Sequence, residues 1–348
     1  MADAPPPFVP IDEAGGLVFL TRLPGSKDDF PDERSEAVAE RFWGKIEPGA
    51  GDSEGDSKPV WIHLDRTKER ANHWVNERSG LPEVVGDALL AAETRPRAVE
   101  RADGLLVILR GVNVNVGAEP DELIVIRMWF EPGRAVTLRQ SRFMTVRRLR
   151  AAAEQGHAPA TTGELLVAIA DGVSARLGPV VENLQSLLDG TEDELAEDNP
   201  RDVSTRDIAE VRRQAIRLRR YLAPQRDALL SLAASPSPLL NQDLRAELQE
   251  IAQRTARFVE DLEEVRDRAA VSQEELRAAR ERQANKTMYL LTLVAAIALP
   301  LGLITGLLGI NVGGMPGADS PAAFWVVTVG MVVIAGVLVG VFKWLKWL

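Results

Sequence analysis

The chain has no cysteine and only three histidines among its 348 residues. Without cysteine, neither disulfides nor thiolate metal sites can form anywhere in it. His63, His73 and His157 are too far apart in the sequence for any two of them to occupy positions i and i+4 on one helix face, where they could share a metal ion. They remain weak candidates for metal ligands, and His63, which lies in a predicted strand, is more readily interpreted as structural.

Motifs for enzymatic chemistry are also missing. The sequence has no phosphate-binding glycine loop, no dinucleotide fingerprint and no set of residues that pairs a nucleophile with a base. Its 51 acidic residues outnumber its 41 basic residues, which gives a net charge of −10. Such a charge repels nucleic acid and concentrates cations, although it also serves solubility alone. We therefore predict a protein that is not an enzyme, with no bound cofactor and no nucleic-acid partner.

Charge is absent from a long run near the carboxyl end. Residues 288–310 form an apolar segment of 23 residues without a charged side chain. At about 1.5 Å per residue a helix of this length spans roughly 34 Å, which is enough to cross a bilayer core of about 30 Å. Residues 324–342 form a second apolar segment, and residues 311–323 connect the two. The sequence thus predicts an integral membrane protein with two transmembrane helices.

The basic residues indicate the orientation of these helices. Arg282 and Lys286 precede the first segment, Lys343 and Lys346 follow the second, and the connection 312–323 contains no lysine or arginine. Because basic residues concentrate on the cytoplasmic side, both termini are predicted to be cytoplasmic and the connection to face outward. We expect a multi-pass protein of the inner membrane, in contact with lipid.

The remainder of the chain divides into three predicted parts. Residues 1–14 form a proline-containing tail, and residues 15–160 form an α/β sandwich domain. Its strands are expected at 16–21, 59–64, 105–116, 122–130 and 134–139, and its helices at 68–77 and 82–93, with a loop at 47–58. Residues 161–285 form a helical stalk, with helices at 163–198 and 203–234. Residues 286–348 form the membrane domain.

A regular apolar seam marks the longest predicted helix. Its positions are separated by alternating steps of four and three residues, which is typical of a helix packed along its whole length. The seam residues are Leu244, Leu248, Ile251, Thr255, Phe258, Leu262, Val265, Ala269, Ser272, Leu276, Ala279 and Gln283. No helix-breaking residue occurs before Pro300, so one helix of about 65 residues is expected to continue into the first transmembrane segment. A coiled-coil dimer with a membrane anchor is the alternative.

Two transmembrane helices cannot enclose a water-filled pathway. Transport would require a homo-oligomer with one first-segment helix from each subunit around a common axis. A stripe of small or weakly polar residues along this helix is the candidate pore lining. It consists of Asn285, Met288, Thr292, Ala295, Leu299, Gly302 and Thr305. Small residues also serve simple helix packing in lipid, which is the alternative interpretation.

The outer end of the first segment carries a family resemblance. Gly309, Ile310 and Asn311, followed by Met315-Pro316, resemble the Gly-x-Asn signature of the CorA family of divalent-cation transporters. The longer run Gly-Ile-Asn-Val-Gly-Gly-Met-Pro-Gly and the closing Lys-Trp-Leu are more similar to the zinc-transporting ZntB branch than to the magnesium branch. Similar segments at 61–65, 94–97 and 219–227 extend the resemblance over nearly the whole chain.

The resemblance implies a pentameric funnel whose pore is lined by the first transmembrane helix, with a Gly-Ile-Asn selectivity loop at its outer end. A ring of Asn311 side chains would present neutral oxygens to a hydrated cation. The magnesium branch commonly has an acidic residue after Met-Pro, where this chain has Gly317, so Asp319 is left as the acid of the outer mouth. Zinc is the expected cargo. A magnesium or broad divalent-cation channel is the alternative, a scaffold that transports nothing is a third hypothesis, and proton coupling stays open.

Overall fold

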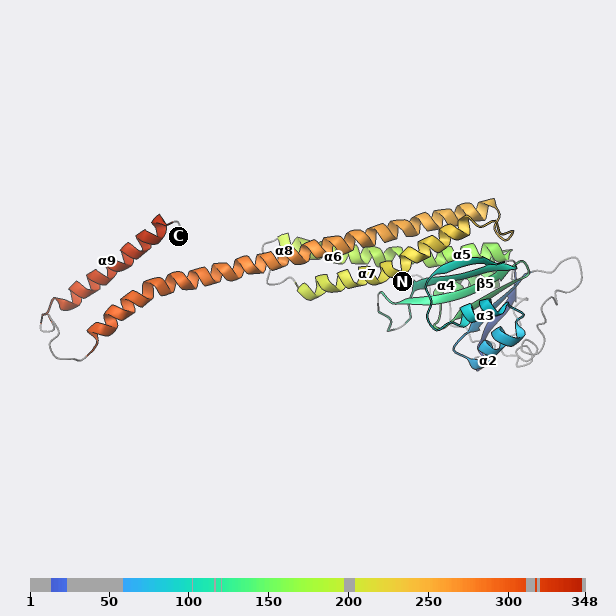
Figure 1. Ribbon diagram of the computed structural model, residues 1–348, viewed down its shortest axis with the longest axis horizontal. Helices are drawn as coiled ribbons and strands as arrows, with labels where there is room; N and C mark the ends of the chain where they lie inside the picture. Colours follow the sequence, from blue (N-terminus) through green and yellow to red (C-terminus); the bar gives the residue numbers. More distant parts are fainter. Residues whose placement is uncertain are drawn as a thin grey trace, which may run out of the picture. The chain divides into compact units, whose positions relative to one another are not determined.

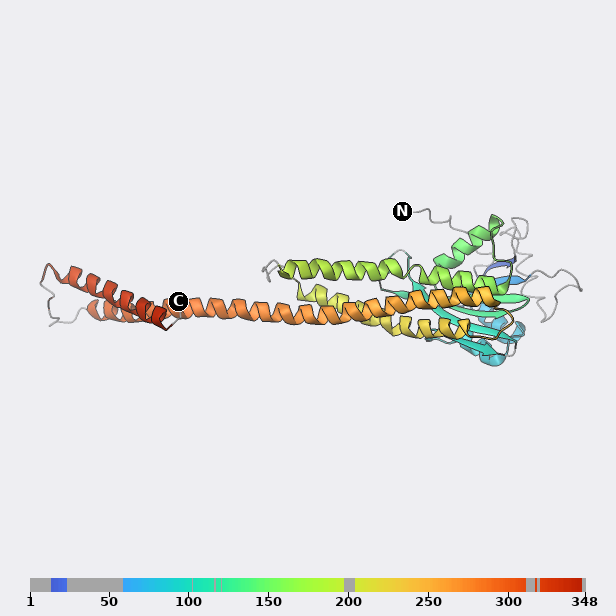
Figure 2. The same cartoon turned by 90° about the horizontal axis from the view of Figure 1, so that it is seen from above.

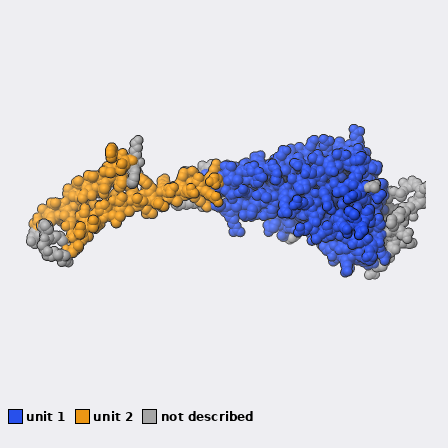
Figure 3. All heavy atoms as spheres, in the orientation of Figure 1, with its two compact units in different colours: residues 1–197, 204–273 blue, residues 198–203, 274–348 orange. Residues whose placement is uncertain are grey.

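The computed structural model describes residues 14–23, 59–101, 103–115, 117–119, 121–196, 204–310, 317 and 320–345. The predicted loop at 47–58 and almost all of the predicted tail at 1–14 lie outside these residues. The described residues fall into two compact units (Figure 3). Unit 1 contains those up to residue 273, and unit 2 contains those from 274 to 345. The sheet and most of the helical stalk therefore share one unit.

A six-stranded mixed sheet forms the centre of unit 1. Its strands are β1 (Leu17–Arg22), β2 (Val60–Asp65), β3 (Arg97–Arg101), β4 (Gly104–Val112), β5 (Leu123–Glu131) and β6 (Arg134–Arg139). Their order across the sheet is β1-β2-β6-β5-β4-β3. The β2–β6 pair is parallel and the other pairs are antiparallel. All five predicted strands are confirmed, with ends shifted by up to four residues.

The largest shift, at the end of β4, has a local cause. The strand was predicted to reach Val116 but ends at Val112. The side-chain oxygen of Asn113 accepts a hydrogen bond from the Asn115 backbone nitrogen at 3.1 Å. This short-range bond offers the backbone a turn in place of the sheet ladder, which is the usual effect of asparagine at such a position.

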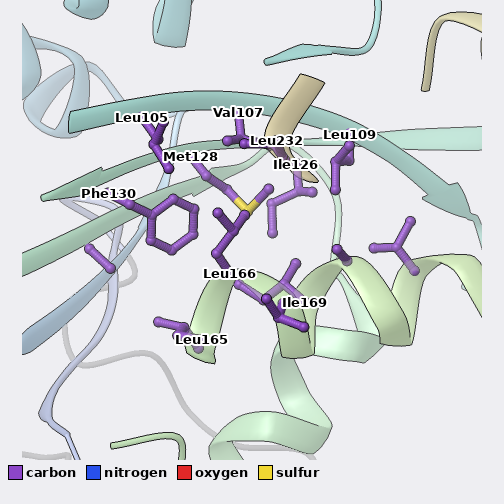
Figure 4. Close-up of a cluster of buried hydrophobic side chains, with 14 of the residues drawn as sticks. Leu105, Val107, Leu109, Ile126, Met128, Phe130, Leu165, Leu166, Ile169 and Leu232 are labelled. Carbon is purple, nitrogen blue, oxygen red and sulfur yellow. The ribbon is translucent and has the colours of Figure 1, made fainter. Parts of the chain in front are cut away.

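Both faces of the sheet are covered, because β4 and β5 carry consecutive apolar residues whose side chains point alternately to the two faces. Figure 4 shows one face, where β4 and β5 residues lie against α5 (Thr162–Ser174) and Leu232 of α7 (Thr205–Ala233). On the other face, Leu106 and Trp129 belong to a second core with α2 (Glu69–His73), η2 (Trp74–Arg78) and α3 (Glu83–Leu90). The result is a layer of helices on each side of the sheet, which confirms the predicted α/β sandwich.

Two elements of unit 1 were not predicted. The edge strand β3 has the sequence Arg-Ala-Val-Glu-Arg, and none of its residues is buried. Charged side chains are common on edge strands, where they discourage pairing with other chains, but they hide the apolar alternation that identifies a strand. The other element is α4 (Met144–Glu154), whose three arginines and three alanines give a weak apolar stripe.

The predicted helix at 163–198 is two helices. α5 ends at Ser174 and α6 (Gly178–Ala196) begins after a short turn. The break coincides with Gly178-Pro179. Proline lacks the backbone N–H that a helix interior needs and disfavours helical geometry in the residue before it, so it fits the first turn of a new helix.

The long helix α8 (Gln242–Leu308) contains 67 residues, which corresponds to about 100 Å. The prediction of one continuous helix into the first apolar segment is confirmed. Its seam is buried from Leu244 to Leu276 except at Phe258, where the neighbouring Val259 is buried instead. Ala279 is half-buried and Gln283 is exposed.

Polar contacts between helices accompany the seam. The Thr255 hydroxyl lies 3.1 Å from the Ser174 hydroxyl of α5. Arg268 donates hydrogen bonds of 2.5 Å to Asp189 and Glu192 of α6. Arg219 of α7 forms an ion pair with Glu263. The seam thus packs against helices of its own chain, so it is no evidence for the coiled-coil dimer that was the alternative.

Unit 2 contains the end of α8 and the helix α9 (Ala323–Trp344). Both helices are long and apolar enough to cross a membrane, and their most apolar windows contain no residue buried within the chain. In Figures 1 and 2 they lie side by side. Helices are therefore present at both predicted segments, at 288–308 within α8 and throughout α9, and each is long and apolar enough to cross a membrane.

Candidate functional site

The candidate ion pathway lies on the end of α8 within unit 2. This part of the helix follows Lys286, and the sequence contains no further charged residue before Lys343 except Asp319. The carboxylates, imidazoles and thiolates that hold divalent metals in stable sites are therefore missing from both apolar helices. Any cation on this path would meet only hydroxyl, amide and carbonyl oxygens.

The predicted pore-lining stripe lies on the part of α8 that is exposed in the single chain. All seven residues, from Asn285 to Thr305, are exposed. The half-buried residues occupy the opposite side of the helix: they are Leu293, Ala296, Ile297, Pro300, Leu301 and Ile304. On α9 a matching half-buried face contains Val327, Met331, Ala335 and Leu338. The two helices therefore cover these faces of each other and leave the stripe uncovered. That the stripe lines a pore stays a prediction.

Two threonines of the stripe have a defined hydrogen-bonding state. Thr292 donates its hydroxyl hydrogen to the Met288 carbonyl at 2.9 Å. Thr305 has the Leu301 and Gly302 carbonyls at 3.1 Å from its hydroxyl oxygen. Because a hydroxyl has one hydrogen and two lone pairs, each oxygen keeps acceptor capacity after this bond. These oxygens can accept hydrogen bonds from the water shell of a cation.

The glycines of this helix are not explained by the single chain. An added Cβ at Gly302 or Gly306 would meet no atom within 4 Å. Neither residue has a positive φ. Glycine in a helix interior costs roughly 0.5–1 kcal/mol relative to alanine, so a position with free space offers it no advantage within this chain. The single chain therefore gives no packing reason for glycine at these two positions.

The helix ends at the predicted selectivity loop. The Gly309 N–H donates to the Thr305 carbonyl at 2.9 Å, and the Ile310 N–H donates to the Leu307 carbonyl at 3.5 Å. Gly309 and Ile310 are exposed and follow the last helical residue, Leu308. Asn311 and Asp319 lie outside the described residues. The role of the loop therefore stays a prediction.

The three histidines lie at separate places in unit 1. His63 is buried in β2, where its Nδ1 lies 2.8 Å from the Thr137 hydroxyl, and burial lowers the pKa of its imidazole well below the ordinary value. His73 faces Glu77 at 3.1 Å, and His157 is exposed after α4. Within the described part of the chain, no three histidine or acidic side chains gather as a metal site. A metal-binding role for any of the three stays an untested prediction.

The chain is similar to known proteins over most of its length. A family model described as "CorA-like Mg2+ transporter protein" matches residues 56–344. The chain is 37% identical over 290 residues to "Divalent cation transporter CmaX" of Pseudomonas aeruginosa, covering 83% of this chain and 87% of the relative. It is 32% identical over 306 residues to "Zinc transport protein ZntB" of Pectobacterium carotovorum subsp. carotovorum, covering 87% of this chain and 91% of the relative.

A solved structure shows the same similarity along the full chain. It is described as "structure of the full-length CmaX protein", and it matches with a TM-score of 0.80 and 32% sequence identity. The match covers 97% of this chain and 99% of that chain. The similarity therefore includes the sheet, the helical stalk and the two apolar helices together.

Proposed function

The chain belongs to the CorA family of ion transporters, and we propose that it carries divalent cations, zinc foremost, across the inner membrane through a pore lined by the first transmembrane helix. The observation that carries this proposal is the uncovered stripe on α8. It is uncharged and mostly small and weakly polar, with Met288 and Leu299 as its larger apolar members, and α9 covers the opposite face of the same helix.

The pathway is formed by several copies of the chain. One α8 and one α9 leave the stripe open on one side, so neighbouring α8 helices must complete the wall around a common axis. The free space at Gly302 and Gly306 lets these helices approach closely, as small residues do in membranes. The family resemblance of the sequence implies five copies, with both termini in the cytoplasm.

The lining passes a cation that keeps most of its water. Thr292 and Thr305 offer hydroxyl oxygens, and the Gly309 and Ile310 carbonyls with Asn311 offer further neutral oxygens at the outer end. Neutral dipoles attract a dication without holding it as tightly as carboxylates do, which suits conduction. Asp319 adds one acid per subunit at the outer mouth.

Zinc is the first choice of cargo because a relative named for zinc transport aligns over most of both chains. The alternative is a broad divalent-cation transporter. It is favoured by the relative named "Divalent cation transporter CmaX", which has the higher identity of the two.

Flux into liposomes tests the proposal. The full chain is reconstituted with an ion-sensitive dye inside the vesicles, and uptake of Zn²⁺, Mg²⁺, Ni²⁺ and Cd²⁺ is measured with and without a pH gradient. We expect saturable uptake that is fastest for Zn²⁺. Uptake of all four ions at similar rates would favour the broad transporter, and a dependence on the pH gradient would establish proton coupling.

Empty liposomes and liposomes with the Gly302→Leu variant are the controls. Absence of uptake for every ion and every gradient, from protein that is inserted and oligomeric, would overturn transport. A membrane scaffold would then be the better explanation.

A further inference from the structure

Three arginines of unit 1 converge on one short segment at the end of α3. Arg66 donates to the Leu90 carbonyl at 2.7 Å and to the Ala91 carbonyl at 3.2 Å. Arg127 donates to the same Ala91 carbonyl at 3.1 Å, and Arg110 donates to the Thr94 carbonyl at 3.1 Å. Two guanidinium groups therefore share a single carbonyl oxygen, with a third beside them.

Arg127 is unusual among the buried arginines. The three buried arginines of the described chain are Arg127, Arg139 and Arg150, with exposures of 1%, 8% and 1%. Arg139 faces the Asp65 carboxylate at 3.7 Å, and Arg150 pairs with Glu154 at 3.1 Å. Arg127 has only the Ala91 carbonyl, and its Nε and one terminal nitrogen are buried without a hydrogen-bond partner.

The neighbouring arginines make this arrangement costly. Burial, together with the positive charges of Arg66 and Arg110, lowers the pKa of Arg127 to about 10. The Nε atoms of Arg66 and Arg110 are also buried without a partner. A buried charge without a counter-charge is strongly unfavourable, so natural proteins usually pair it.

The local negative charge is too small to balance the cluster. The end of α3 supplies roughly half an elementary charge through its free carbonyls. The Tyr221 ring lies 3.9 Å from the Arg110 guanidinium carbon and offers it a π-face but no full charge. Glu93 also attracts Arg110, but its side chain is exposed. Three guanidinium charges therefore retain an excess of more than one positive charge. A phosphate group, with about −1.5 to −2 charges near pH 7, matches this excess better than a monovalent anion.

We propose that Arg66, Arg110 and Arg127 form a binding site for a phosphate group, either inorganic phosphate or the phosphate of a small organic molecule. Arg66 and Arg110 are half-buried and give access from solvent, while Arg127 lies innermost with donors to spare. Planar guanidinium groups suit this ligand because they donate paired hydrogen bonds to its oxygens. The site lies on the sheet and is separate from the ion pathway, so it does not depend on the proposed transport.

Thermal unfolding of the full chain in detergent tests the site. The midpoint is measured with inorganic phosphate, with glycerol 3-phosphate and with sodium chloride at equal ionic strength. A ligand that binds only the folded state raises the midpoint with concentration. We expect either phosphate compound to raise it above the chloride value. A rise with glycerol 3-phosphate alone would mean that the natural ligand has an organic part.

Two variants locate the effect. Arg127→Gln and Arg66→Gln should each need at least tenfold more phosphate for the same rise. Arg226→Gln, which removes one half-buried positive charge on α7 that pairs with Asp227, should respond as the wild type does. If Arg127→Gln does not fold, Arg66→Gln still tests the site, because Arg66 is only half-buried. No rise above chloride in the wild type, or equal rises in the wild type and in Arg66→Gln, would overturn the proposal.

Discussion

Replacing Gly302 by leucine tests the rotation of the first transmembrane helix. In the single chain an added Cβ at this position meets nothing within 4 Å. Leucine is also the better helix former, by up to about 1 kcal/mol, so the change should not weaken the chain itself. If the stripe lines a pore, each subunit adds one isobutyl group to a narrow ring. We expect ion flux to fall at least tenfold, which corresponds to about 1.4 kcal/mol of added barrier.

The other membrane helix offers a matched control. Gly340 of α9 is also exposed, and a Cβ added there likewise meets nothing within 4 Å. Gly340→Leu makes the same chemical change on a helix that the proposal places outside the pore. Its flux should stay near the wild-type value. Leu303→Phe adds volume beside Gly302, away from the predicted stripe, and should also be tolerated.

The assay is dye-reported Zn²⁺ uptake into liposomes, with oligomer mass measured in detergent for each variant. Mass must be unchanged for the flux to be interpreted as an effect on the pathway. Equal loss of flux in Gly302→Leu, Leu303→Phe and Gly340→Leu would refute the assignment of the stripe. Normal flux in Gly302→Leu alone would mean that another face of α8 lines the pathway.

Two further predictions concern unit 1. Leu262 is a fully buried seam residue, so Leu262→Pro should lower the free energy of unfolding by about 3 kcal/mol or more and weaken the assembly. The volume-conserving Leu262→Met should lower it by less than about 1.5 kcal/mol. Equal unfolding midpoints and equal oligomer masses for the two variants would contradict the buried seam. His63 has a lowered pKa in the folded state, so the unfolded chain binds more protons and stability should fall as the pH drops below about 6.5. His63→Gln should reduce this fall, as measured by the unfolding midpoint between pH 7.5 and 5; an unchanged slope would mean that other groups cause it.

Periodic features were the most predictable part of this chain. The seam of α8 repeats from Leu244 to Gln283, so polar members such as Thr255 and Ser272 do not obscure it, and each apolar segment is long enough to span a bilayer. The break at 175–177 was missed although Gly178-Pro179 marked it. The apolar pattern is present in both α5 and α6, and it therefore favoured one long helix over a break at the glycine–proline pair.

The arginine cluster could not be predicted, because its members come from distant segments. Arg66 follows β2, whereas Arg110 and Arg127 lie on β4 and β5. Only the pairing of β4 with β5 and their packing against α3 bring these side chains to the Ala91 carbonyl. In the sequence each is one arginine among many, and nothing distinguishes a buried one from an exposed one. The sequence also could not predict that the seam packs against helices of its own chain, since the same pattern is typical of packing within a chain and between chains.

Asn311 gives the most direct test of the outer loop, because two roles predict opposite results. As a helix cap, Asn311 would act through a left-handed backbone whose N–H bonds the last carbonyls of α8, and glycine would replace it with little loss. The Thr305 and Leu307 carbonyls already accept hydrogen bonds from the Gly309 and Ile310 backbone N–H groups, so fewer carbonyls at the end of α8 need a cap.

As part of an oxygen ring, Asn311 acts through its amide dipole, so Asn311→Leu, of similar size but without a dipole, should abolish Zn²⁺ uptake while oligomer mass stays normal. Asn311→Asp should retain binding but slow release, because a ring of full charges holds a dication more tightly than a ring of amides. Uptake into liposomes and competition by Mg²⁺ measure both effects. Wild-type uptake by Asn311→Gly would rule out the ring, because glycine keeps the cap and removes the oxygen.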